Sequence, residues 1–208
     1  MKDSKIRVRS NDELKSREKC FLEITNMLKE NNINFFLQGG VLLGAYREKS
    51  FIKWDWDVEI SLFRDDFYNN FHLIKKKLQE LNFKIYKDVN LKKNIKIDCY
   101  KEFSYETSAY TLMSWNYDKS KRMYFRKEIN IPEKFLKKFS EIIFLNNKFY
   151  CPNPIEEYLT YQYGDWQTPL RTSIKKDYMT SKYFNEESFA KKIIKQIYYF
   201  VRSQWQKI

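Results

Sequence analysis

The stretch from Trp54 to Ile60 alternates apolar and acidic side chains at every position. Because successive side chains of a strand point to opposite faces, this pattern predicts a strand with Asp55, Asp57 and Glu59 on one face. The tryptophans and aliphatic residues between them would share the other face. Carboxylates two positions apart on a strand lie roughly 6.5–7 Å apart and repel by about 2.5 kcal/mol at an effective dielectric constant of about 20.

No basic residue is interleaved on this acidic face to offset the repulsion. Hard divalent cations with oxygen ligands are the usual way to make such a row of carboxylates tolerable. The solvated outer face of an edge strand is the alternative explanation. The residues that precede the strand favour the metal site.

A glycine-rich turn precedes the acidic strand. The short apolar run Asn34–Gln38 leads into Gly39 and Gly40, and a short helix is expected over Val41–Arg47. The chain has only four glycines, and three of them lie between Gly39 and Gly44. Glycines at such a junction let backbone N–H groups approach a phosphate, and a helix N-terminus favours negative charge. A tight turn that needs positive φ is the simpler alternative, but a carboxylate strand directly afterwards is typical of metal-dependent nucleotide sites.

These segments, Gly39–Arg47 and Phe51–Glu59, resemble the LicD/fukutin-related branch of the nucleotidyltransferase-fold superfamily. Cys151–Leu159 and Tyr163–Pro169 extend the resemblance, which covers roughly residues 33–170. The resemblance implies an α+β nucleotidyltransferase fold, in which helices flank a small mixed sheet. It also implies transfer of a phospho-substituent from a CDP-linked donor to a glycan hydroxyl. Phosphocholine, phosphoethanolamine and polyol phosphate all remain open as the transferred group.

The resemblance also implies the acids of the site. Asp57 and Glu59 match the paired metal ligands of the family, although Glu59 stands where the family usually has Asp, and Asp55 is a further ligand. In Asn94–Tyr100, a second alternating stretch, Asp98 matches the third acid, on a strand expected beside the first pair. It would ligate a second metal ion or deprotonate the acceptor hydroxyl. Mg²⁺ or Mn²⁺ is the expected cofactor, since phosphoryl transfer depends mainly on positioning and on neutralising charge.

Four residues are expected to bind the donor phosphates. Gly39 and Gly40 would cradle them through the backbone, and Arg47, which matches the family arginine, would hold one directly. A salt bridge from Arg47 to the acidic strand is the alternative. Lys53 would supply a second cation.

The remaining patterns predict one domain over residues 1–208. We expect a nucleotidyltransferase-like core over 10–103 and appended strands and helices over 104–208. A capping box at Ser10 opens the first helix, and Asp65 opens the second. Hairpins are expected over 104–128 and 142–150, the latter with its turn at Asn146-Asn147. A helix capped by Asn153 runs from 155 to 163, and a final amphipathic helix opens at Asn185.

The net charge of +12 permits nucleic acid, an anionic membrane surface or a phosphorylated substrate as partner. Arg122, Arg126 and Lys127, among aromatic residues, could hold phosphates, although ordinary strand packing is the simpler interpretation. A nucleotidyltransferase that adds a nucleotide to a small molecule, RNA or protein is the competing enzyme class. A basic RNA-binding module is the non-enzymatic alternative, but it has no use for the acidic row, so nucleic acid is not the expected partner.

Three widely spaced cysteines indicate reduced, buried thiols and a cytoplasmic protein. No segment has the pattern of a signal peptide or a membrane span. The basic amphipathic end is compatible with peripheral contact at the inner face of a membrane. The expected partners are therefore a CDP-linked donor and a glycan acceptor, lipid-linked acceptors included.

Overall fold

The computed structural model describes residues 6–91, 94–102 and 107–184. Its helices are α1 (Asn11–Glu30), α2 (Gly39–Leu43), α3 (Arg64–Glu80), α4 (Ile155–Tyr163) and α5 (Lys175–Tyr178). Its strands are β1 (Phe35–Phe36), β2 (Asp57–Phe63), β3 (Lys84–Leu91), β4 (Asn94–Glu102), β5 (Thr107–Asp118), β6 (Met123–Arg126), β7 (Ile129–Pro132), β8 (Phe139–Phe144) and β9 (Asn147–Pro152). A π-helical turn, Gly44–Glu48, continues α2.

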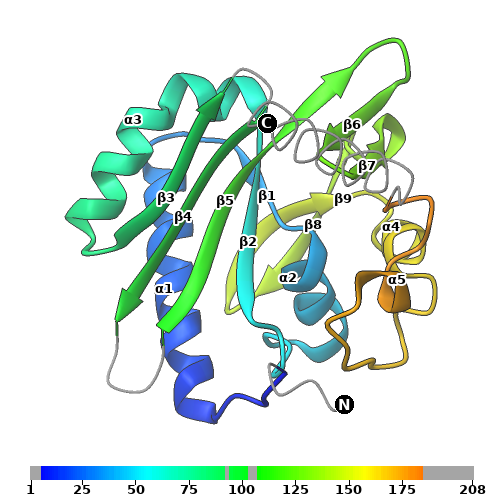
Figure 1. Ribbon diagram of the computed structural model, residues 1–208, viewed down its shortest axis with the longest axis horizontal. Coiled ribbons are helices and arrows are strands. Elements are labelled where there is room, and N and C mark those ends of the chain that lie inside the picture. The colour runs from blue at the N-terminus through cyan, green and yellow to red at the C-terminus, as the bar shows by residue number, and fades with distance from the viewer. Residues whose placement is uncertain (1–5, 92–93, 103–106, 185–208) are drawn as a thin grey trace, which may run out of the picture.

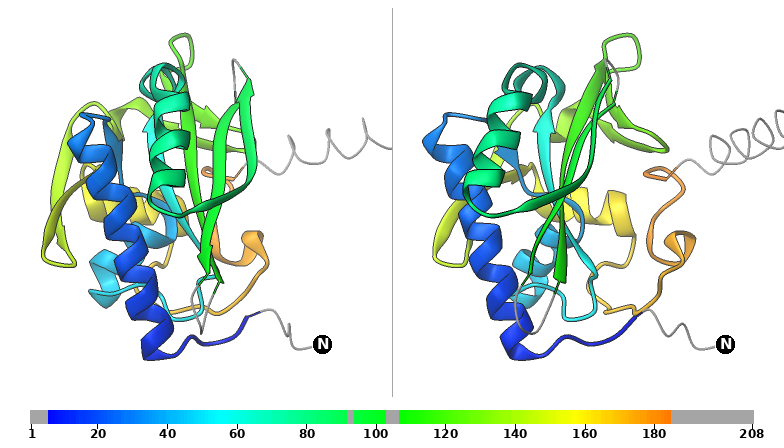
Figure 2. Two further views of the ribbon diagram at one scale, coloured as in Figure 1. Left: turned by 90° about the vertical axis from the view of Figure 1, so that its left-hand side faces the viewer. Right: turned by 60° about the vertical axis from the view of Figure 1, so that its left-hand side comes forward.

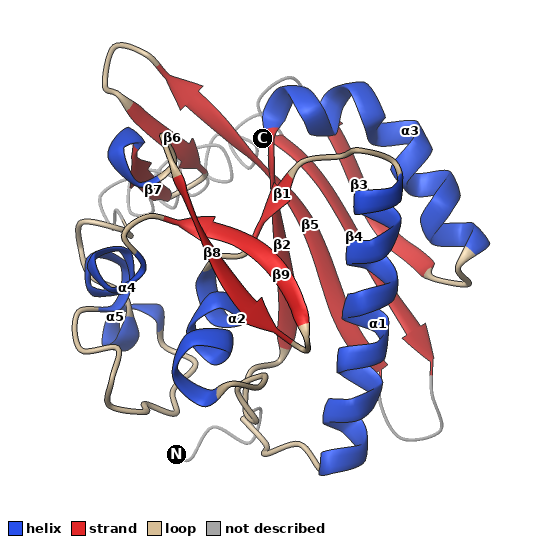
Figure 3. Cartoon of the chain, turned by 180° about the vertical axis from the view of Figure 1, so that it is seen from behind, coloured by secondary structure: helices blue, strands red, loops and turns tan. Residues whose placement is uncertain are grey.

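A mixed sheet with the strand order β1-β2-β5-β4-β3 organises the fold, and β6 and β7 extend it from the far end of β5. Strands β2 and β5 are parallel, whereas the other neighbours are antiparallel. Helices α1 and α3 cover one face of the sheet, and α5 lies on the other side (Figures 1 and 2). The hairpin β8–β9 packs beside α1 on the helical face (Figure 3). The predicted α+β fold, a mixed sheet flanked by helices, is confirmed.

The first helix begins as the sequence predicts. The Ser10 hydroxyl accepts a hydrogen bond from the Glu13 N–H, and the Glu13 carboxylate accepts one from the Ser10 N–H at 2.7 Å. This reciprocal pair satisfies donors that a helix N-terminus otherwise leaves without partners. The buried stripe of α1 then packs on the sheet and the hairpin, where Phe21 lies 5.4 Å from Phe149 and 5.9 Å from Phe144 between ring centroids.

The apolar patterns of α3 and β4 are also confirmed. Most of the residues predicted to face inward are fully or almost fully buried: Phe67, Phe71, Ile74, Leu78, Ile95, Ile97 and Cys99. Leu81, also predicted to face inward, follows the end of α3 and is only partly buried. The three cysteines are free and buried. One continuous core therefore lies between the sheet and the helices that cover it.

The position of β5 differs from the expected arrangement. It inserts between β2 and β4, so that Glu59 pairs with Thr111 and Thr111 pairs in turn with Asp98. The prediction that the strand of Asp98 lies directly beside the acidic strand is therefore wrong, because one complete strand separates them. Strands β4 and β5, which lie on either side of the expected boundary between residues 103 and 104, pair with each other in this sheet.

The predicted hairpins are present with small shifts. The turn between β8 and β9 is formed by Leu145 and Asn146, both at positive φ, one residue earlier than predicted. Helix α4 ends at Gly164, as predicted, but Asn153 does not cap its start. The Asn153 side chain instead accepts a hydrogen bond from the Ser140 hydroxyl at 2.8 Å. The final helix predicted from Asn185 lies outside the described residues.

Among the described helices, none is both long enough and apolar enough to cross a bilayer.

Candidate active site

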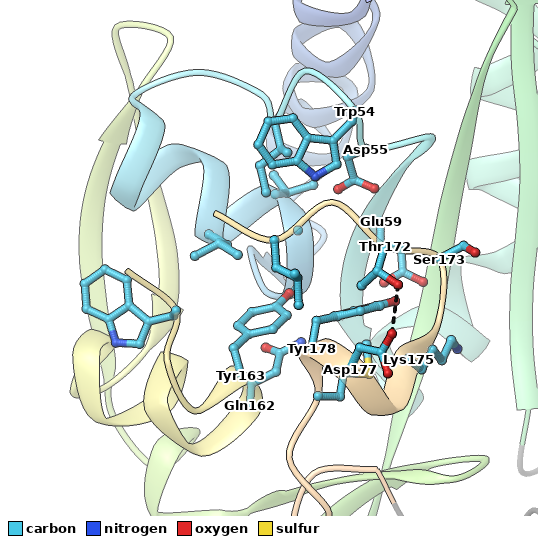
Figure 4. A pocket seen from close by; sticks show the side chains of 18 of the residues that line it. Trp54, Asp55, Glu59, Gln162, Tyr163, Thr172, Ser173, Lys175, Asp177 and Tyr178 are labelled. Carbon is cyan, nitrogen blue, oxygen red and sulfur yellow. Dashed lines mark hydrogen bonds between the residues drawn. The ribbon is translucent and has the colours of Figure 1, made fainter. Parts of the chain in front are cut away.

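A cavity of about 670 Å³ opens between the sheet edge at β2, the start of α2 and the segment that follows α4. Asp55, Asp57 and Glu59 line it, together with Gly39 and Gly40. Figure 4 shows the side chains of Asp55 and Glu59 on one side of the cavity, with residues of α4 and α5 on the other. The sequence-predicted acidic row and glycine turn therefore meet at one place.

The acidic row is not one continuous strand. Strand β2 begins at Asp57, and Asp55 lies in the preceding turn, where its N–H donates to the Ile52 carbonyl at 3.1 Å. The prediction that Trp56 shares the buried face of Val58 is wrong, because 71% of Trp56 is exposed.

Two arginines explain why Asp55 and Trp56 lie in a turn rather than in the strand. The carbonyl of Asp55 accepts a hydrogen bond from Arg17 at 2.7 Å and another from Arg9, whose second terminal nitrogen donates to the Trp56 carbonyl at 3.3 Å. These side chains bind carbonyls that a strand would otherwise present to a neighbouring strand. The turn therefore stays outside the sheet, while the Asp55 carboxylate still reaches the cavity.

The carboxylates perturb one another. Burial, reinforced by the charge of Glu59, raises the pKa of Asp55 to about 6, although Arg17 and Arg9 oppose the shift. Burial, followed by the charges of Glu59 and Asp55, raises the pKa of Asp57 well above its ordinary value. Both shifts have the causes expected when acids are brought together away from water without a cation between them.

The two glycines make room for these acids. A Cβ on Gly40 would lie 2.0 Å from Oδ2 of Asp55, a distance that no side chain can adopt. A Cβ on Gly39 would lie 3.5 Å from Oε2 of Glu59, and Gly39 itself has a φ of +63°. Both glycines belong to the first turn of α2 rather than to a separate turn before it. The close approach seen in the structure is therefore between the glycine backbone and carboxylates.

Of the two predicted cations, Arg47 lines the cavity and Lys53 does not. Arg47 donates to the Trp166 carbonyl at 2.7 Å and forms a salt bridge with Glu48 at 2.9 Å, so its partner is not the acidic strand. The Lys53 side chain is exposed, and its carbonyl accepts a hydrogen bond from the Arg9 N–H at 2.8 Å.

Asp98 does not line the cavity. It is only 2% exposed, and its carboxylate accepts a hydrogen bond from the Thr111 hydroxyl at 2.7 Å and pairs with the Lys96 ammonium at 2.7 Å. Its charge is thus neutralised within the sheet. The structure brings Asp55, Asp57 and Glu59 together but leaves Asp98 apart from them.

The site has the donors that a hard divalent cation prefers. All three acids offer carboxylate oxygens, and the elevated pKa of Asp55 and Asp57 shows that a positive charge between them would be favourable. Within the described part of the chain, no three His, Cys, Asp or Glu side chains already stand in a metal-binding group. The residues therefore fit a divalent cation, and holding one would need the side chains to close around it.

The later part of the chain supplies walls that local sequence patterns did not identify. These residues come from β6, α4, α5 and the segment between the two helices: Arg126, Gln162, Thr172, Ser173, Lys175, Asp177 and Tyr178. The Thr172 hydroxyl and the Asp177 carboxylate are hydrogen bonded at 3.1 Å (Figure 4). Only Arg126 had a sequence signal, as one of three cations among aromatic residues. The others are brought to the cavity by long-range folding alone.

Three comparisons with known proteins were made. The model of the family described as LicD/FKTN/FKRP, nucleotidyltransferase domain, matches residues 32–154, which is more than half of the chain. No curated protein matches the chain. Among solved structures, ANT(2″)-Ia in complex with adenylyl-2″-tobramycin is similar at 11% identity and a TM-score of 0.45, over 70% of this chain and 76% of that one. A solution structure of the antibiotic-resistance factor ANT(2″)-Ia has 11% identity and a TM-score of 0.48, over 94% and 100%.

Proposed function

Because the chain belongs to the LicD/FKTN/FKRP family of nucleotidyltransferase domains, we propose that it is a metal-dependent transferase of substituted phosphate groups. It would move a phospho-substituent from a CDP-linked donor to a glycan hydroxyl. The observation that carries this proposal is the meeting of three carboxylates, Asp55, Asp57 and Glu59, at one side of a cavity large enough for a nucleotide. Such a cluster has little structural use unless a cation joins it.

Asp57 and Glu59 are the proposed primary ligands of Mg²⁺ or Mn²⁺, and Asp55 is the third. Bound there, the ion would neutralise charge on the donor phosphates and orient them for in-line attack. The protein's own part is to hold these half-buried acids at the cavity, where the glycines of α2 leave room for Asp55 and Glu59. Asp98 has no place in this ligand set, since it lies outside the cavity lining and is paired with Lys96.

The charge of the cavity supports a metal-dependent donor. Five acidic and three basic side chains line it among the described residues: Asp55, Asp57, Glu59, Asp165, Asp177, Arg47, Arg126 and Lys175. A diphosphate would be repelled by this excess of acids unless a divalent cation came with it. Arg47 does not balance these acids, because its guanidinium is already paired with Glu48.

Aromatic side chains give the cavity surfaces for stacking. Trp54, Trp56, Tyr163, Trp166 and Tyr178 all line it. The rings of Tyr163 and Tyr178 stack on each other with centroids 6.3 Å apart, which joins α4 to α5 beside the cavity. Such faces suit a nucleobase or the transferred substituent.

In the proposed reaction, the acceptor oxygen bonds to the phosphorus that carries the substituent, and the bond from that phosphorus to the CMP oxygen breaks. CMP leaves with the bonding electrons, and the hydroxyl proton of the acceptor passes to water. The competing reaction, addition of a nucleotide to a small molecule, RNA or protein, would instead release pyrophosphate. Product analysis with labelled donors therefore separates the two.

Asp57→Asn tests the site directly. The change removes one proposed metal ligand and also one of the mutually repelling charges. We expect kcat with CDP-linked donors to fall by about a hundredfold or more, because charge on the phosphates is no longer neutralised. The melting temperature of the metal-free protein should stay equal or rise by a few degrees. Such a rise corresponds to a gain on the order of 1 kcal/mol in the free energy of unfolding.

Asp88→Asn is the matched control. Asp88 lies on β3, outside the cavity lining, and is paired with Lys75 of α3. It should leave turnover unchanged. Full activity in Asp57→Asn would show that the acidic cluster is not the active site. Screening CDP-choline, CDP-ethanolamine, CDP-ribitol and CDP-glycerol for Mg²⁺-dependent protection against melting would identify the donor.

A further inference from the structure

Arg126 lies in an unusual environment at the edge of the cavity. It is the last residue of β6, where the sheet reaches over towards α4, and it lines the cavity. Its side chain is only 10% exposed. The nearest carboxylate is that of Glu59, whose Oε1 lies 4.0 Å from Nη1 of Arg126. A buried guanidinium therefore stands directly beside one of the three acids of the site.

The interactions of Arg126 are incomplete in this state. Its Nε is buried and has no hydrogen-bond partner among the described residues. The 4.0 Å contact with Glu59 is an electrostatic pair but is too long to be a hydrogen bond. A guanidinium carries five donors, and removing them from water without acceptors is unfavourable. An anion that enters the cavity would supply acceptors for the donors of Arg126.

A cation bound by the three acids would increase the need of Arg126 for an anionic partner. If Glu59 turned its carboxylate to a metal ion, Arg126 would lose the attraction of its nearest negative charge. An anion bound to the same ion would then lie within reach of the guanidinium, because Glu59 is the neighbour of both. Arginine is well suited to this, since its planar fork can form two parallel hydrogen bonds to phosphate oxygens.

We propose that Arg126 binds a phosphate oxygen of the diphosphate donor, next to the ion held by Asp57 and Glu59. This inference rests on the proposed function for the identity of the diphosphate. It assigns the site a phosphate-binding residue from β6, in addition to the residues of α2 and the turn that follows it. Glu59 holds the guanidinium near the anion position until the donor arrives.

The experiment measures binding rather than turnover. CDP in the presence of Mg²⁺, and inorganic pyrophosphate with Mg²⁺ as a probe without the nucleoside, are titrated into the full-length protein by calorimetry. Arg126→Ala should weaken the binding of both probes by about tenfold or more, as expected for loss of a charge-assisted hydrogen bond. Arg126→Lys, which keeps the charge but not the fork, should lie between wild type and alanine.

Arg122→Ala is the control on the same hairpin. Arg122 is 74% exposed and pairs with Glu133 rather than with a cavity residue, so its removal should leave both affinities unchanged. Mn²⁺ binding in the absence of anions is measured in parallel. It should change by less than about threefold in Arg126→Ala, because Arg126 is not a metal ligand.

Equal affinity of Arg126→Ala and wild type for CDP and pyrophosphate would overturn the inference. A parallel loss of Mn²⁺ binding would also overturn it, since Arg126 would then act only by arranging the carboxylates. Failure of the proposed function has a different signature: wild type would bind the anions but release no CMP from any CDP-linked donor.

Discussion

The contact between Gly40 and Asp55 shows how closely the glycine turn and the acidic row depend on each other. The Asp55 carboxylate occupies the space that a side chain at position 40 would need. The two residues lie in separate segments, and neither motif contains any sign of this contact by itself. At the scale of single residues, the site therefore depends on the missing side chain of Gly40 as much as on the acids.

Substituting each glycine separately tests this relation. Gly40→Ala should displace the Asp55 carboxylate and weaken Mn²⁺ binding by about tenfold, within the range of losses seen when a ligand's support is removed. Gly39→Ala is the matched comparison, because its φ of +63° makes the change costly for the backbone while Glu59 stays at an ordinary contact distance. It should lower the free energy of unfolding by about 1–2 kcal/mol.

The two effects are separated by measuring Mn²⁺ affinity and thermal stability on both variants. Equal Mn²⁺ affinity in Gly40→Ala and wild type would show that Asp55 does not take part in the metal site.

At the scale of elements, local sequence patterns predicted those features that depend on contacts between residues close in sequence. The capping box and apolar stripe of α1, the stripe of α3 and the alternation of β4 all depend on neighbours within a few residues, and each is confirmed. The end of the acidic strand was not predictable in this way. Whether Asp55 and Trp56 join a sheet depends on Arg9 and Arg17, which approach them from about forty residues earlier in the chain.

The pairing of β5 with β2 is another long-range property. The hairpin predicted over 104–128 includes β5 as a strand, but nothing in its sequence shows that it enters the sheet between β2 and β4. That insertion is what separates Asp98 from the acids of the cavity. The glycines and the acids were thus predictable from sequence, whereas the walls contributed by β6, α4 and α5 were not, apart from Arg126 and Tyr163, which belong to patterns noted in the sequence.

Asp98→Asn distinguishes the two interpretations of this residue. Lys96 would lose its charged partner in the sheet, whereas the Asn amide oxygen can still accept from Thr111, so we expect the free energy of unfolding to fall by about 1–3 kcal/mol. Below the melting transition, Mn²⁺ affinity should match that of wild type. Loss of Mn²⁺ binding in a variant that remains folded would instead restore Asp98 to the metal site.

At the scale of the whole molecule, the charge of the chain and the charge of its cavity have opposite signs. The chain carries a formal net charge of +12, whereas acids outnumber bases in the described lining of the cavity. The general excess of positive charge can draw anionic substrates towards the protein. The acids at the site then require a divalent cation before such a substrate can bind there.

This arrangement predicts how stability depends on pH. The folded-state pKa of Asp55 is about 6, above its ordinary value of 3.8, so protonation favours the folded state. The contribution is complete below pH 3.8 and is lost as the pH rises through 6. The metal-free protein should therefore be less stable at pH 7.5 than at pH 5, by about 1 kcal/mol from this group.

Adding Mg²⁺ at pH 7.5 should reverse the loss, because the ion takes the place of the proton. Asp55→Asn is the control and should weaken the pH dependence, although Asp57, whose pKa is also raised, keeps part of it. Glu13 does not interfere, since its hydrogen bond from Arg7 lowers its pKa to about 2 and its titration lies below this range. Melting curves with and without Mg²⁺ at both pH values provide the measurement; a pH-independent melting temperature would contradict the prediction.

The cavity walls continue well past the residues that define the family. The match ends at residue 154, yet Tyr183 reaches back to donate a hydrogen bond to Gln38 at 3.1 Å, directly before the glycine turn, and Tyr158 donates to the same oxygen at 3.3 Å. Shared ancestry is thus recognisable in a shorter stretch than the one that encloses a substrate. Relatives that keep the common core but differ in this later region could bind different molecules without changing the acids at all.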